Sequence, residues 1–193
     1  MRRIGIIGGG RMGSALAAAL RRAGYDVAVA HRGEWLAVAR DADVLIIALT
    51  WNATSELATL GDAVVGKVVI TCTNVETEGG LAVPAGTSGA EAIARELPSA
   101  HVVSAFNHLY AELLDDPGGF DGAPLSVFFC GDDGEALAVT RELIEALGFD
   151  AVPSGPLANA RMLEMLAELM VYLVRVRGYG PAGVALRLVR APT

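Results

Sequence analysis

The chain has 193 residues, of which 53% are hydrophobic and 19% charged, so it is too apolar for a disordered protein and long enough to bury a core. Its net charge of −7 argues against nucleic acid and membrane surfaces as partners, because both require a basic face. The most apolar helical segment, residues 162–176, is interrupted by Glu164, Glu168 and Arg175, and no secretory signal core follows Met1. We therefore expect a cytoplasmic protein.

Apolar runs bounded by glycine, proline or asparagine alternate along the chain with segments of helical period. In chain order they predict a strand at Arg3–Ile7, a helix at Arg11–Ala23, a strand at Asp26–Ala30, a helix at Glu34–Arg40, a strand at Val44–Leu49, a helix at Thr54–Leu60, a strand at Val68–Cys72, a helix at Ser88–Leu97, strands at His101–Ala105 and Leu125–Cys130, a helix at Glu135–Leu147 and a last strand at Asp150–Val152. Strands rich in Val, Ile and Leu that alternate with helices form a parallel sheet covered on both faces. The sequence thus predicts an α/β fold of the Rossmann type, with a doubly wound, mostly parallel sheet.

The pattern changes after Pro153, where only helical segments at Leu157–Arg177 and Pro181–Arg190 remain. We divide the chain into a sheet domain of residues 1–153 and a C-terminal helical extension of residues 154–193, which we expect to line a cleft, form a dimer contact or do both. An apolar stripe on its first helix favours a homodimer, whereas Glu164 and Glu168 are expected on a solvated face. The stripe consists of Met162, Met165, Leu166, Leu169 and Leu173.

Two long loops, Asn74–Thr87 and Tyr110–Pro124, follow the carboxyl ends of predicted strands. Ligands of open parallel sheets bind at those ends, and loops of this length are often functional. We expect both loops to border a ligand.

A glycine-rich turn, Gly8-Gly9-Gly10-Arg11-Met12-Gly13, directly follows the first strand and opens the first helix. This is the context in which the pattern G-x-G-x-x-G indicates a dinucleotide site. The first glycine allows the tight turn, the second lets the backbone approach a pyrophosphate, and the third packs the helix against the sheet. We assign Gly8, Gly10, Arg11, Met12 and Gly13 to the cofactor, and residues 1–153 to its binding domain.

The end of the second strand indicates which dinucleotide binds. NAD-binding proteins place an acidic residue there to hold the ribose hydroxyl, but this chain has His31 and Arg32. The planar guanidinium of Arg32 suits a 2′-phosphate, with His31 and Arg11 as further contacts. Because Glu34 lies past the strand tip, its alternative role as a ribose ligand is the weaker reading, and we expect NADP(H).

Hydride transfer is the chemistry that a nicotinamide cofactor implies. A short-chain dehydrogenase is excluded, because the chain has no Tyr-x-x-x-Lys pair. The single lysine, Lys67, precedes a strand and so lies at the wrong edge of the sheet. We expect Cys72 and Cys130 in the core, not in a disulfide or a metal site. There remains hydride transfer to an acceptor that needs little acid–base help, such as a flavin or deazaflavin.

Several segments together resemble the NADP oxidoreductase family dependent on coenzyme F-420, which includes NADPH-dependent deazaflavin reductases. They are Ile7 to Gly13, Ala48-Leu49-Thr50-Trp51, Gly66 to Ile70, Cys72-Thr73-Asn74, Ser88 to Glu91, Ser104-Ala105-Phe106-Asn107-His108, Cys130 to Asp133 and Gly155-Pro156-Leu157-Ala158-Asn159-Ala160-Arg161. The Ala-Phe-Asn and Gly-Pro-Leu segments are the specific ones, because many families share the glycine turn. The chain departs from the residues typical of deazaflavin reductases at Arg11-Met12 and at Thr50-Trp51. These departures bear on the identity of the acceptor more than on the NADPH site.

The resemblance implies a Rossmann domain, a small C-terminal helical part and direct hydride exchange between NADPH and the deazaflavin ring of coenzyme F-420. It assigns Thr50, Trp51, Thr73, Asn74 and Ala105 to the nicotinamide side. It also implies that the acceptor ring stacks in a cleft lined by Phe106, Asn107 and His108.

Three of these residues have structural alternatives. His108 is a candidate proton donor near neutral pH or an ordinary loop histidine. Asn107 either holds a ligand or satisfies loop backbone groups, and Trp51 either stacks on a ring or belongs to the core.

Three functions remain open. The first is an NADPH-dependent deazaflavin reductase. The second is a reductase of a flavin, a quinone or a flavin-bound ferric ion, also with a small-molecule acceptor. The third is an NADP(H)-binding sensor without turnover.

Overall fold

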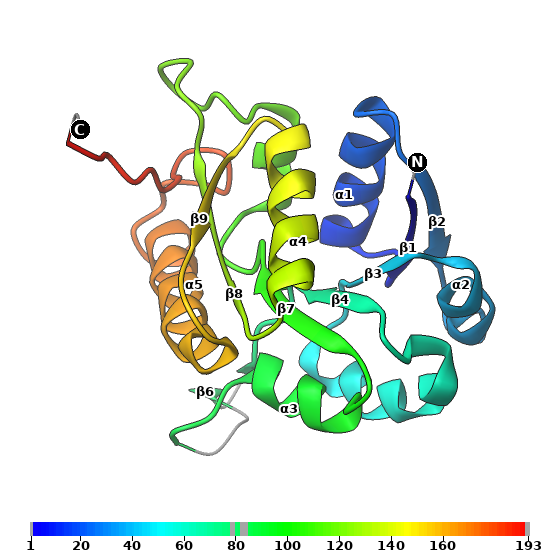
Figure 1. Cartoon of the computed structure of the whole chain (residues 1–193). Coiled ribbons are helices and arrows are strands. Elements are labelled where there is room, and N and C mark those ends of the chain that lie inside the picture. Colours follow the sequence, from blue (N-terminus) through cyan, green and yellow to red (C-terminus); the bar gives the residue numbers. More distant parts are fainter. Residues whose placement is uncertain (1, 78–79, 82–84, 192–193) are drawn as a thin grey trace.

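The structure is a computed structural model that describes residues 2–77, 80–81 and 85–191 (Figure 1). A seven-stranded sheet with the order β2-β1-β3-β4-β7-β8-β9 forms its centre. Its strands are β1 (Arg3–Ile7), β2 (Asp26–Ala30), β3 (Val44–Ile47), β4 (Val68–Thr71), β7 (His101–Ala105), β8 (Ser126–Gly131) and β9 (Asp150–Pro153). Neighbouring strands are parallel except β7 and β8, so β8 and β9 run against the other five. The predicted mostly parallel sheet is confirmed.

Helices cover both faces of this sheet. They are α1 (Arg11–Arg22), α2 (Trp35–Asp41), α3 (Gly89–Glu96), α4 (Gly134–Ala146) and α5 (Ala160–Arg175), with 3₁₀ helices η1 (Trp51–Val64), η2 (Ala111–Asp115) and η3 (Leu157–Asn159). One buried cluster joins the sheet to α1, α4 and η2, and a second joins its other face to α2, η1, α3 and α5. Two cores on opposite faces are the mark of a doubly wound fold, as predicted. Among the described residues, no helix has the length and apolar character needed to cross a membrane.

The strand order locates the ligand crevice. From β1 the chain first builds β2 on one side and then crosses to β3 on the other. The turns that follow β1 and β3 therefore run in opposite directions at the carboxyl edge of the sheet. Ligands of such sheets bind at this point, where the strand order reverses.

Two local signals in the sequence are confirmed. The side chain of Ser88 caps α3 by accepting a hydrogen bond from the backbone N–H of Glu91 at 3.1 Å, as the Ser-x-x-Glu spacing predicts. Helix α4 ends just before Gly148, whose φ of 87° is the left-handed conformation that favours glycine after a helix.

The loop at 74–87 contains a short hairpin that was not predicted, β5 (Glu76–Thr77) with β6 (Gly80–Leu81). Gly79 and Pro84 of this loop lie outside the described residues. The loop at 110–124 holds η2 and packs against α1 through Leu113 and Leu114, which belong to the core.

One predicted helix has a different form in the structure, and another prediction was wrong. The segment at Thr54–Leu60 belongs to a longer 3₁₀ helix, which is interrupted at Gly61 by non-helical angles of φ 47° and ψ −126°. The segment at Pro181–Arg190 is not helical: the Leu186 carbonyl accepts from the Ser126 N–H at 2.9 Å, and the Leu188 N–H donates to the Ser126 hydroxyl at 2.9 Å. These backbone groups are satisfied by the start of β8 and not by a helix of their own.

Glu164 also differs from the expectation of a solvated face, since it is only 6% exposed. Its carboxylate accepts hydrogen bonds from the backbone N–H groups of Gly89 at 3.1 Å and Ala90 at 3.2 Å, so α5 supplies a cap for the first turn of α3. Burial raises the pKa of this carboxyl, and the two N–H donors oppose the rise. The contact anchors α5 to the sheet domain.

We expect Glu164→Ala to lower the free energy of unfolding by about 1–2 kcal/mol, because two buried donors lose their acceptor. Glu96→Ala, at an exposed glutamate on α3, should change it by less than about 0.5 kcal/mol. Since the folded-state pKa is raised, the wild type should lose stability relative to Glu164→Gln as pH rises through the ordinary carboxyl pKa. Urea unfolding between pH 4 and 7 measures both effects, and equal losses for Glu164→Ala and Glu96→Ala would contradict the cap.

Candidate functional site

The glycine turn between β1 and α1 has the close packing that its spacing predicts. Gly8 has a φ of 112°, and a Cβ atom there would lie 2.4 Å from the Ala48 carbonyl oxygen at the end of β3. A Cβ atom on Gly13 would lie 1.9 Å from the Gly8 carbonyl oxygen. At Gly10, in contrast, a Cβ atom would meet nothing within 4 Å. The turn therefore leaves open space at the N-terminus of α1, where free N–H groups can hold a pyrophosphate.

The turn after β2 uses both His31 and Glu34 internally. The His31 ring covers Gly9, because a Cβ atom on that glycine would lie 2.6 Å from its Cε1 atom. The Glu34 carboxylate accepts from the His31 backbone N–H at 2.8 Å. Glu34 is thus engaged within the turn, which weakens its alternative role as a ligand of a ribose hydroxyl.

The two arginines predicted near a 2′-phosphate lie on different flanks of the turn. Arg32 pairs with Glu56 of η1, which follows β3, whereas Arg11 pairs with Glu112 of η2, which follows β7. The prediction that Arg11 approaches the same phosphate as Arg32 is therefore not supported by its position. Both arginine side chains are about three-quarters exposed, and such surface pairs contribute only about 0–1 kcal/mol. An incoming phosphate can replace the carboxylate of Glu56.

The residues predicted beside the nicotinamide follow β3 and β4, but not all face one place. Thr50 is exposed at the start of η1, and Thr73 is buried, with its hydroxyl donating to the Leu49 carbonyl at 3.2 Å. The Trp51 ring lies against the first turn of α3: a Cβ atom on Gly89 would be 3.3 Å from its Cζ3 atom. Trp51 thus contacts α3, but it is only half-buried and belongs to neither core cluster.

Asn74 and Asn107 join the loops after β4 and β7. The Asn74 amide donates to the Asn107 carbonyl at 2.6 Å, and the Asn107 amide donates to the Asn74 Oδ1 at 3.1 Å. Asn107 also contacts His108, whose Nδ1 lies 3.3 Å from the Asn107 Oδ1. The two hydrogen bonds between Asn74 and Asn107 hold the ends of β4 and β7 in one fixed arrangement.

His108 is buried, with 4% of its surface exposed, and its ring packs edge-on against Phe128. The Phe128 backbone N–H lies 3.4 Å from Nε2, on the side of the ring that faces β8. Burial lowers the pKa of His108 to about 4. At neutral pH the ring is uncharged, and it lacks the imidazolium proton that a general acid would use.

Phe106 does not line a cleft, in contrast to the prediction. Its ring is 1% exposed and belongs to the same core cluster as Ala105, which is also fully buried. Phe106 has a φ of 63°, an unusual conformation for a residue with a side chain. This backbone turn sends the ring into the core and directs the following residues, Asn107 and His108, toward the cleft.

A cleft of about 210 Å³ lies where the loops after β4 and β7 meet α5. It is lined by Met12, Cys72, Asn74, Asn107, His108, Leu109, Tyr110, Ala167, Met170, Val171 and Arg175. It brings together Met12, Asn74, Asn107 and His108 from the predicted set. The helical extension was expected to line a cleft, but sequence reasoning did not name Met170, Val171 and Arg175, because helical periodicity does not tell which strand end a helix crosses. Burial raises the pKa of the Cys72 thiol to about 12, so this cysteine is not a nucleophile.

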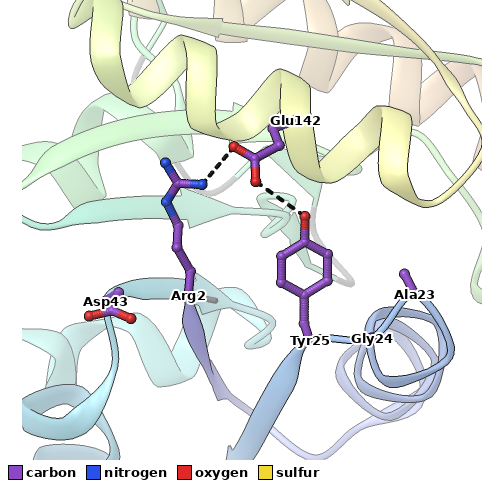
Figure 2. Close-up of a pocket in the computed structure, with 6 residues that line it drawn as sticks. All are labelled: Arg2, Ala23, Gly24, Tyr25, Asp43 and Glu142. Atoms are coloured by element: carbon purple, nitrogen blue, oxygen red, sulfur yellow. Dashed lines mark hydrogen bonds and ion pairs between the residues drawn. The ribbon is translucent and has the colours of Figure 1, made fainter.

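A larger cavity, of about 700 Å³, lies at the opposite end of the sheet (Figure 2). Arg2 pairs with Glu142 at 2.6 Å, and Tyr25 donates to the same carboxylate at 3.4 Å. Nearby, Lys67 donates to three carbonyls around the end of α2, including Ala39 at 2.6 Å. These groups flank the amino ends of the strands and satisfy one another, whereas ligands of open parallel sheets bind at the carboxyl ends.

Comparison with known proteins agrees with this geometry. Residues 3–37 match the protein family described as NADP oxidoreductase coenzyme F420-dependent. A crystal structure from Arthrobacter, described as a candidate F420-dependent NADP reductase, superimposes with a TM-score of 0.88 at 26% identity and covers 98% of this chain and 100% of its own. The resemblance found in the sequence is confirmed, because the family model matches the segment with the glycine turn and the structural similarity extends over nearly the whole chain.

Two further proteins are similar over only part of their own length. Metalloreductase STEAP3 of Rattus norvegicus is 30% identical over 179 residues, which cover 85% of this chain and 36% of the rat protein. The chain thus spans about a third of the length of this curated relative. An imine reductase from Bacillus cereus, with 18% identity and a TM-score of 0.66, covers 93% of this chain and 63% of its own, and it shows the fold alone.

Proposed function

We propose that this protein transfers hydride between NADP(H) and the deazaflavin coenzyme F-420. The observation that carries the proposal is the cleft beside the glycine turn, which combines amide groups and apolar side chains with a histidine whose lowered pKa keeps it neutral at pH 7. Hydride exchange with a deazaflavin ring needs position and exclusion of water more than acid–base catalysis. The family description supports the same acceptor.

In this proposal the chain's own residues bind and orient. The backbone of Gly10 and Met12 at the N-terminus of α1 binds the pyrophosphate, and Arg32 binds the 2′-phosphate. Thr50 and Thr73 border the nicotinamide, which supplies the hydride when NADPH is bound. Asn74 and Asn107, held by their reciprocal hydrogen bonds, face the space between the two rings.

The acceptor lies in the cleft between residues 1–153 and the extension 154–193. Met170 and Val171 of α5 supply its apolar wall and keep water away from the ring. Asn107 and His108 supply the opposite wall, with His108 as a neutral positioning residue. In this proposal both parts of the chain contribute residues to the cleft.

A second candidate is the reduction of a flavin or a flavin-bound ferric ion by the same NADPH site. The similarity to a protein named Metalloreductase supports it. The absence of a required proton donor is equally compatible with this acceptor and with a sensor that binds NADP(H) without turnover.

Anaerobic mixing of the protein with NADPH and oxidised F-420 tests the proposal through the visible absorbance of the coenzyme. We expect rapid bleaching with NADPH and little with NADH. Parallel reactions contain free flavin, and flavin with a ferric chelate. Turnover only with these acceptors would select the second candidate, and tight NADPH binding with no turnover would select the sensor.

Arg32→Ala tests the choice of NADP(H) over NAD(H). We expect NADPH affinity to fall by about 10- to 100-fold, because a charge-assisted contact with the phosphate is lost, while NADH affinity changes by less than about twofold. Isothermal titration calorimetry measures both affinities. Arg95→Ala is the matched control, because Arg95 lies on α3 and pairs with Thr87. Equal losses for the two dinucleotides would contradict the assignment.

A further inference from the structure

Glu164 is a buried titratable group that the proposed reaction does not use. It lies on α5, and the first turn of α3 supplies two hydrogen-bond donors to it, the N–H groups of Gly89 at 3.1 Å and Ala90 at 3.2 Å. Three residues earlier on α5, Arg161 donates two hydrogen bonds to the Glu91 carboxylate of α3, at 2.6 and 2.8 Å. Two such contacts on one helix fix both the position and the rotation of α5 against α3 (orange and green in Figure 1).

The face of α5 that carries Glu164 continues into the cleft. Ala167 and Val171 lie three and seven residues after Glu164, so they lie on the same face of the helix. Both residues line the cleft of about 210 Å³, together with the buried Met170. A change in the position or rotation of α5 at Glu164 therefore moves the apolar wall of the cleft.

The opposite wall of the cleft also contacts the first turn of α3. A Cβ atom on Gly89 would lie 2.6 Å from the Val75 Cγ2 atom, so this glycine allows α3 to pack closely against the loop after β4. Val75 is buried and directly follows Asn74, which lines the cleft and donates to the Asn107 carbonyl. The first turn of α3 thus lies against both walls.

We propose that Glu164 is a positioning residue of the acceptor cleft: by joining α5 to the first turn of α3, it sets the distance between the two walls. This inference rests on the proposed function, because it takes the cleft as the site of the acceptor ring. Glu164 is not among the residues that line the cleft, so its effect on the acceptor passes through the side chains of α5 that do. The phosphates of NADP(H) bind at the N-terminus of α1 in this proposal, so Glu164 should influence the acceptor and not the dinucleotide.

Steady-state kinetics with NADPH and the acceptor that the wild type reduces tests this role. Glu164→Ala should raise the KM for the acceptor on the order of tenfold, because a wall displaced by about 1 Å loses its contacts with the ring. The kcat and the NADPH affinity should stay within about threefold of the wild type. Glu164→Gln keeps one oxygen that accepts an N–H, so it should return the acceptor KM to within about threefold of the wild type.

Ser88→Ala is the matched control. The Ser88 hydroxyl caps the same end of α3 by accepting from the Glu91 N–H at 3.1 Å, but its removal leaves both oxygens of Glu164 in place. The control should lower the melting temperature as Glu164→Ala does, yet leave the acceptor KM within about twofold of the wild type. Equal increases of this KM in the two variants would give Glu164 a structural role alone and overturn the proposal.

Amide hydrogen exchange separates this inference from the choice of acceptor. With no acceptor present, Glu164→Ala should speed exchange along α5 after Glu164 by about tenfold or more, because the helix loses its contact with α3, whereas Ser88→Ala should not. If the wild type reduces no acceptor but this difference is found, the proposed function fails and the positioning of α5 by Glu164 is supported. The same exchange along α5 in both variants would overturn the inference, even if F-420 is the acceptor.

Discussion

Gly13→Ala is expected to destabilise the protein by on the order of 3 kcal/mol and to lower the melting temperature by about 10 °C. The added methyl group would lie 1.9 Å from the Gly8 carbonyl oxygen, so α1 must move away from the turn. Because that movement also displaces the N–H groups at the start of α1, NADPH binding should be lost together with stability. Thermal unfolding and NADPH titration measure the two effects.

Gly10→Ala should separate the same two effects. Its methyl group meets nothing within 4 Å, and the φ of −71° and ψ of −171° at this residue are accessible to alanine. We expect a melting temperature within about 2 °C of the wild type but an NADPH affinity reduced by about tenfold or more, because the methyl group occupies the space that the pyrophosphate needs. Gly134→Ala, which also meets nothing within 4 Å, is the control. Unchanged NADPH binding in Gly10→Ala would contradict the phosphate site.

His108 should give the protein a strong dependence of stability on pH. Its pKa is lowered to about 4 in the folded state, whereas the unfolded chain takes up the proton near pH 6.5. Between these values the unfolded state binds more protons, so the free energy of unfolding falls as pH decreases, by about 3 kcal/mol in total. Below pH 4 the folded state is protonated too, and the contribution becomes constant.

Urea unfolding of the wild type and His108→Gln between pH 4 and 7 isolates this contribution. The difference between the two proteins should change by about 3 kcal/mol across this range. The pH dependence of turnover should be the same for the wild type and His108→Gln near pH 6.5. A change of rate near this pH that is present in the wild type and lost in His108→Gln would show that His108 is a proton donor.

The predicted fold was largely right because its signals are local. The strands at Arg3–Ile7, Asp26–Ala30 and His101–Ala105 have the predicted bounds, since short Val- and Ile-rich runs between turn residues need no distant contact to be recognised. The segment at Pro181–Arg190 has helical composition, yet it is not helical, because its backbone forms hydrogen bonds with the start of β8.

The candidate site was predicted in part. Asn74 and Asn107 were placed at strand ends, and the parallel sheet brings them into direct contact. Phe106 was assigned to the cleft by resemblance, but its positive φ turns the ring into the core. No sequence pattern reports the direction of a side chain after such a turn, and none indicated that Glu164 would cap α3.

By itself, the sequence determined the α/β fold, the glycine turn, and the position of His31 and Arg32 at the end of β2. For each of these, the spacing and type of residues along a short stretch are sufficient to predict it. Only the tertiary structure decided which partners Arg11 and Arg32 have, that His108 is buried and neutral, and which residues of α5 form one wall of the cleft. These features depend on contacts between residues far apart in the chain. Burial and charge at such contacts are properties of the folded whole, so local pattern does not encode them.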